Sequence, residues 1–257
     1  MIFVLELLFT YLLSGFILSA LFMRICAYNK EDCLKYLFFF IGTGPITISW
    51  LLTRLLIFFP NQSPLTYILI INFIFLGVFL FVRQECWLLI KSMRNQFRIK
   101  PMQRDHLVVL VGVSLTSILM IILTCVSSLS ANDPQEYAAT SRLIYQNLNL
   151  NNYPMTMHDE QSGFFAPIMH PLGYNGMIVW SFLIQGSSAN VIWMKLLSPL
   201  HTAFTMLLLY AFASPKGRLV SLLTIFLFIT TPIYFSHTHI GHVDPVRIYS
   251  FLLPAIW

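Results

Sequence analysis

The stretch "LVVLVGVSLTSILMIILTCVSSL", Leu107 to Leu129, decides the fold class, because it holds no charged residue over its whole length. A helix needs about 20 such residues to cross the hydrocarbon core of a bilayer. Comparable uncharged runs lie at residues 7–23, 36–53, 65–82 and 219–235, with further apolar runs at 191–212 and from 248 onward. We therefore expect an all-α, polytopic helical membrane protein with about seven transmembrane helices.

The composition excludes an ordinary soluble domain. Hydrophobic residues make up 57% of the chain and charged residues 10%, and the mean hydropathy is +0.75. Soluble domains carry roughly 25% charged residues. The net charge of +5 does not indicate a nucleic-acid partner, because most Lys and Arg residues fall in alternate short loops, at 24–35, 83–104 and 216–218. The positive-inside rule predicts that these loops are cytoplasmic and that the N-terminus lies outside.

Two domains follow from this topology. Residues 1–106 form an N-terminal three-helix membrane region with a basic cytoplasmic loop, and residues 107–257 form a membrane core with external loops at 130–190 and 236–247. The basic stretch after residue 82 is either a helix on the membrane surface or an ordinary connecting loop. The last apolar run stops at Trp257 without basic flanks, so we expect the chain to be truncated at its C-terminus.

The longer external loop is predicted to contain juxtamembrane helices. Its segment "GMIVWSFLIQG", Gly176 to Gly186, is too short to span and is predicted to be an interfacial or re-entrant helix. At the start of the loop, Asp133, Pro134 and Glu136 have the spacing of a helix cap followed by a capping box. A carboxylate fixed by such a cap at a membrane exit could also carry chemistry, and both readings stay open.

Two further polar clusters are predicted on the same outer face. One surrounds His170 in "MHPLGYN", and the other is "SHTHIGHVDP", Ser236 to Pro245. The second holds His237, His239, His242 and Asp244, whose side chains are potential ligands of zinc or a harder divalent ion. Their spacing matches no established metal motif, so polar termination of a membrane helix is an equally open explanation.

The order of these motifs resembles that of the C-type (GT-C) glycosyltransferases. "NDPQEYAATSRLIYQ", "HPLGYNGMIVW" and "GHVDP" follow membrane helices in the manner of the protein-mannosyltransferase-like branch, which includes aminoarabinose transferases and many bacterial polysaccharide enzymes. The resemblance covers about residues 107–257. It departs from the family pattern in that three helices precede the acidic loop and Leu172 replaces a second proline.

The resemblance implies transfer of a sugar from a polyprenyl-phosphate donor to a glycan, lipid or protein acceptor. Asp133 would be the catalytic base, and a divalent cation held by His242 and Asp244 would stabilise the leaving phosphate. The same family likeness places the protein in a bacterial inner membrane, with the site facing the periplasm or the exterior. Residues expected to bind substrate are Glu136, Tyr137, His170, Tyr174 and Arg247, and Arg142 is a further cation in the outer loops.

Two other functions are compatible with the sequence. A transporter or flippase would place ionisable groups at mid-membrane facing a cavity, for which Arg54 and Lys195 are the basic candidates. A non-catalytic membrane assembly protein, or an inactive fragment of a glycosyltransferase, is the other alternative. The concentration of polar residues in the outer loops favours the enzyme over the carrier.

Overall fold

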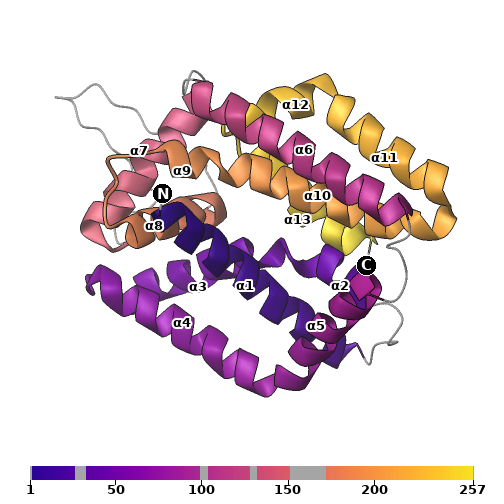
Figure 1. Cartoon of the computed structure of the whole chain (residues 1–257). Helices are drawn as coiled ribbons and strands as arrows, with labels where there is room; N and C mark the ends of the chain where they lie inside the picture. Colours follow the sequence, from indigo (N-terminus) through magenta and orange to yellow (C-terminus); the bar gives the residue numbers. More distant parts are fainter. Residues whose placement is uncertain (1, 27–32, 99–103, 128–131, 151–171, 257) are drawn as a thin grey trace.

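The computed structural model describes residues 2–26, 33–98, 104–127, 132–150 and 172–256, and these residues are almost entirely helical (Figure 1). The all-α prediction is confirmed for this part of the chain. In chain order the helices are α1 (Ile2–Ile25), α2 (Cys33–Phe40), α3 (Thr43–Phe58), α4 (Pro64–Phe81), α5 (Arg83–Arg98), α6 (Arg104–Val126), α7 (Asn132–Asn147), α8 (Leu172–Gln185), α9 (Ile192–Lys195), α10 (Leu197–Ala213), α11 (Arg218–Thr230), α12 (Pro232–His239) and α13 (Asp244–Ile256).

Three helical segments in the described ranges are long and apolar enough to cross a membrane: Leu5–Ile25, Pro64–Phe81 and Leu197–Lys216. A fourth is obtained if the bent pair α11 and α12 is counted as one span. The structure therefore supports three to four candidate spans, fewer than the seven expected from the apolar runs. The helices α3 and α6 keep shorter apolar stretches, Thr43–Phe58 and Val111–Val126.

The helices form two groups that lie side by side (Figure 1). The first group packs α2, α3, α4 and α5 against α1, with α8 against α3 and α7 against α8. The second group surrounds α10, which contacts α6, α11, α12 and α13. Contacts of α2 with α10 and of α8 with α9 join the groups. One hydrophobic cluster contains residues from both sides of position 106, and the boundary predicted there stays a prediction.

Small residues set the closest helix approaches in the first group. A Cβ at Gly44 of α3 would collide with the backbone of α1 at Tyr11, and a Cβ at Gly176 of α8 would collide with Ser49 of α3. In addition, the Ser49 hydroxyl donates a hydrogen bond to the Gly173 carbonyl, and the Tyr11 hydroxyl donates to the Met177 carbonyl at 3.0 Å. Such small-residue and hydroxyl contacts hold helices together where lipid surrounds them.

The structure places α8 inside the protein. Every residue from Tyr174 to Ile184 is buried, as expected for a helix that is apolar on all sides. Neighbouring helices, rather than solvent or lipid, therefore surround this segment, and the interfacial alternative stays a prediction. The re-entrant alternative stays a prediction.

Two helix breaks differ from the sequence expectation. The run that begins near residue 36, expected to form one helix, breaks at Ile41–Gly42, between α2 and α3. The run 219–235 is broken at Thr231, and α11 and α12 meet at 67°. The cause of the second break is Pro232, which has no N–H to donate and forces Thr231 into an extended conformation with ψ 113°. The basic stretch after residue 82 is a helix, α5, rather than a loop.

Candidate functional site

The hairpin between α12 and α13 brings its histidines together. His237 lies in the last turn of α12, and the chain turns back through Gly241, whose φ of +79° is readily available to glycine alone. The His242 amide donates to the His237 carbonyl at 3.2 Å and closes the turn. As a result, the rings of His237 and His242 stack with their centroids 4.4 Å apart.

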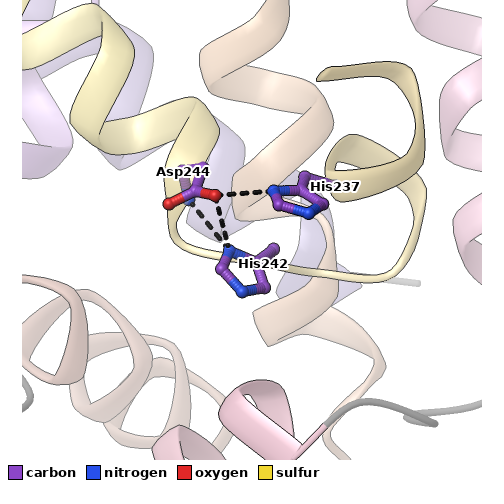
Figure 2. A group of neighbouring side chains, drawn as sticks. All are labelled: His237, His242 and Asp244. Atoms are coloured by element: carbon purple, nitrogen blue, oxygen red, sulfur yellow. Dashed lines mark hydrogen bonds and ion pairs between the residues drawn. The ribbon is translucent and has the colours of Figure 1, made fainter. Parts of the chain in front are cut away.

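The carboxylate of Asp244, the first residue of α13, lies beside the two stacked rings and faces the Nδ1 atom of each (Figure 2). Its Oδ2 atom is 2.6 Å from His237 Nδ1 and 3.2 Å from His242 Nδ1. Its Oδ1 atom lies 3.4 Å from an Arg247 Nη1 atom, a longer and more exposed contact. The potential ligand atoms of His237, His242 and Asp244 all lie within 4.8 Å of one another.

Other helices hold the hairpin loop by its backbone. The Tyr174 hydroxyl of α8 donates to the Gly241 carbonyl at 3.0 Å, and the Ser198 hydroxyl of α10 donates to the His242 carbonyl at 2.5 Å. Both hydroxyls replace hydrogen bonds that the turn cannot make with itself. The loop therefore has a fixed position relative to α8 and α10.

The same contacts extend to α7. The Tyr137 ring meets the Tyr174 ring edge-on, with the centroids 4.9 Å apart, and both side chains are buried. A series of contacts thus joins α7, α8 and the hairpin through the Gly241 carbonyl. It includes four of the residues predicted for the site: Tyr137, Tyr174, His242 and Asp244. The role of this region as a site stays a prediction.

Of the remaining predicted site residues, Asp133 lies in the first turn of α7, which begins at Asn132, two residues before the predicted first helical position, Pro134. The Asp133 side chain and its capping interaction lie outside the described residues, as does the whole of His170. Glu136 is partly exposed on α7. Arg142 donates from Nε to the Ser188 carbonyl at 3.0 Å and fastens the α8–α9 connection rather than the hairpin.

Lys195 is a functional candidate whose burial the sequence did not indicate. It lies at the end of α9, directly before the candidate span Leu197–Lys216, is only 4% exposed and donates from Nζ to the Ser127 carbonyl at 2.5 Å. Its stem packs against the hairpin, since a Cβ at Gly241 would lie 3.1 Å from Lys195 Cγ. Burial lowers the pKa of the Lys195 ammonium. The only signal in the sequence was one cation between two apolar runs.

His237 is the second residue whose role the sequence understated. It was part of the noted histidine cluster but not of the predicted ligand pair. In one continuous helix, a separation of five residues would put His237 and His242 on different faces. The turn at Gly241 reverses the chain between the two residues and brings their rings into contact.

Comparison of the chain with protein-family models, with curated proteins and with solved structures gave no match.

Proposed function

We propose that the chain is a membrane glycosyltransferase of the C type, which moves a sugar from a polyprenyl phosphate to an acceptor hydroxyl at one membrane surface. The observation that carries this proposal is the contact series from Tyr137 through Tyr174 to Gly241, which unites the hairpin with α7, the helix that carries Asp133 in its first turn. An acidic helix start and a histidine–aspartate hairpin at one end of an apolar bundle suit a reaction on a lipid-linked substrate.

In the proposed reaction the acceptor oxygen attacks the anomeric carbon of the donor sugar. The Asp133 carboxylate takes the acceptor proton, the bond between the anomeric carbon and the phosphate oxygen breaks, and polyprenyl phosphate leaves with the bonding electrons. One displacement inverts the anomeric configuration. Arg247 is proposed to stabilise the charge on the leaving phosphate, and His242 and Asp244 would hold a cation that would supply further positive charge there. Glu136, Tyr137, Tyr174 and His170 are proposed to contact the sugar or the acceptor.

The proposed setting is a bacterial inner membrane, with the site facing the periplasm or the exterior. The exposed apolar surfaces of α4 and α11 support burial in lipid, because patches of this size are costly in water. The arrangement of about seven spans with cytoplasmic basic loops is part of the proposal, and its support is the charge pattern of the loops.

The test is sugar transfer from a panel of polyprenyl-phosphate sugars in membranes that contain this chain, or a longer version if the gene encodes one. Asp133→Asn is expected to lower transfer by at least about 100-fold. Asparagine also caps helices, so an unchanged expression level would assign that loss to chemistry rather than folding. Transfer by Asp133→Asn at the wild-type rate would refute the role of Asp133 as base.

One observation favours the transporter alternative. His201 lies in the candidate span Leu197–Lys216, is fully buried, and its Nε2 atom has no hydrogen-bond partner among the described residues. Ionisable groups inside a membrane commonly mark transport pathways. Translocation of a lipid-linked sugar in vesicles that His201→Asn abolishes, without any sugar transfer, would favour the carrier over the enzyme.

A further inference from the structure

The histidine–aspartate trio of the α12–α13 hairpin has the composition of a metal-ligand set. His237 and His242 each direct an Nδ1 atom at the same carboxylate oxygen, and that oxygen belongs to Asp244 (Figure 2). All three residues come from one continuous segment, and all three are partly buried. Two imidazoles and one carboxylate are a ligand set that zinc takes up in catalytic sites, where a fourth position stays open.

Two of the distances between these ligand atoms, those from each histidine to Asp244, are close to the distances that a metal requires. Two ligand atoms that each lie about 2.1 Å from zinc are about 3.0–3.4 Å apart at the usual coordination angles. The separation of 3.2 Å between His242 Nδ1 and Asp244 Oδ2 already satisfies this condition. The separation of 2.6 Å between His237 Nδ1 and the same oxygen is a hydrogen bond. His237 therefore has to withdraw by less than about 1 Å to admit an ion.

We propose that His237, His242 and Asp244 bind one divalent transition-metal ion, with Zn²⁺ the expected occupant. Imidazole nitrogen favours zinc over magnesium and calcium, which prefer oxygen ligands alone. The site adds His237 to the pair predicted from the sequence and leaves a coordination position for a water or a phosphate oxygen. Use of the ion in sugar transfer rests on the proposed function, whereas binding of the ion does not.

Contacts outside the trio hold the ligands in place. Tyr174 and Ser198 fix the carbonyls of Gly241 and His242, so the loop does not need to be ordered when the ion binds. The His242 side chain is 13% exposed, whereas those of His237 and Asp244 are 27% and 31% exposed. The trio is thus open on one side, which gives the ion a path of entry. Arg247 contacts the other carboxylate oxygen, Oδ1, and leaves Oδ2 to the ion.

The experiment measures zinc directly on the full chain, purified in detergent and stripped with a chelator. After addition of Zn²⁺ and removal of the excess, elemental analysis is expected to give about one zinc per chain. His237→Ala and His242→Gln are each expected to weaken zinc binding by at least about 100-fold, since loss of an outer partner alone costs about 10–100-fold. Ser236→Ala, an exposed neighbour in the same segment, is the matched control and is expected to bind zinc as the wild type does.

Substitution with Co²⁺ adds a readout of ligation, because the visible spectrum of bound cobalt reports coordination by nitrogen and oxygen. Wild-type protein that retains no zinc, or ligand variants that bind zinc with wild-type affinity, would show that the trio is a hydrogen-bonded cluster only. Thermal unfolding of each variant separates lost ligation from lost structure. A chain that binds zinc but transfers no sugar would refute the proposed function and leave the metal site in place. A chain that transfers sugar but fails to bind zinc would refute the metal site and leave the proposed function in place.

Discussion

The helices α4 and α8 are both strongly apolar, yet their surroundings are opposite. Only 17% of the α4 span is buried, and Phe73 and Leu80 are more than half exposed. On α8 every residue from Tyr174 to Ile184 is buried, including the polar Asn175 and Ser181. The difference teaches that apolar composition predicts a helix in a non-aqueous setting but not whether lipid or protein surrounds it. The more reliable signals of a protein environment are small and polar residues within the run.

Truncation of the largest buried ring on α8 is the strongest way to test this comparison. Trp180 is fully buried, so Trp180→Ala is expected to lower the free energy of unfolding by about 3 kcal/mol, since it leaves a cavity. We take the lower end of the usual range because the apolar reference for a membrane helix is lipid rather than water. Phe73→Ala on α4 is the control, with an expected change within about 0.5 kcal/mol. Equal losses in thermal or denaturant unfolding would remove the distinction between the helices.

Insertion of bulk tests the same comparison from the other direction. Gly176→Leu drives a side chain into Ser49 of α3 and is expected to cost about 1–3 kcal/mol. Gly77→Leu on α4 meets no atom within 4 Å and is the matched control, expected to be neutral or slightly stabilising. The measurement is the yield of folded, monodisperse protein together with its melting temperature. A tolerated Gly176→Leu would mean that α3 and α8 do not approach as closely as described.

Removal of one hydroxyl tests the link between α8 and the hairpin. Tyr174→Phe keeps the ring against Tyr137 but leaves the Gly241 carbonyl without its donor, at an expected cost of about 1 kcal/mol. Zinc affinity of the hairpin is expected to fall in the same variant, since the turn loses one of its two supports. Thr66→Ala on α4, which removes a hydroxyl at an exposed helix start, serves as the comparison. Unchanged unfolding and zinc binding in Tyr174→Phe would make the contact dispensable.

The smallest expected effect is a difference in chemical labelling between a lipid-facing position on α4 and a buried position on α8. A membrane-soluble carbene reagent, which is activated by light and needs no thiolate, is expected to label Phe73 and to leave Ile178 unmodified in the folded protein. The wild-type chain is labelled, so the measured quantity is the ratio of labelling at the two positions. Comparable labelling at both positions would contradict the burial of α8.

The helices themselves were predictable from the sequence, because long uncharged runs leave few alternatives to a helix in lipid. The start of α4 also followed from local chemistry, with Ser63 accepting a hydrogen bond from the Thr66 amide and Pro64 in the first turn of α4. The break at Pro232 was visible in principle, although the surrounding apolar run concealed it. Local residue preferences thus account for the start of α4 at Ser63 and Pro64 and for the start of α12 at Pro232.

The candidate site was only partly predictable. Its two ends, Asp133 and the histidine segment, stood out as polar groups beside apolar runs. The contribution of His237 depends on a backbone angle at Gly241, and the burial of Lys195 depends on the packing of α6 and the hairpin. Such features arise from tertiary contacts, which periodicity and composition do not encode.

The turn at Gly241 has a consequence for how such a site would be inherited. A residue with a side chain at this position would be strained at φ +79° and would press on Lys195, so the histidines would separate even if both were retained. The proposed metal site therefore depends on glycine at position 241 as much as on the side chains of His237, His242 and Asp244. In any related chain, glycine at this turn would be a better marker of the site than the histidines alone.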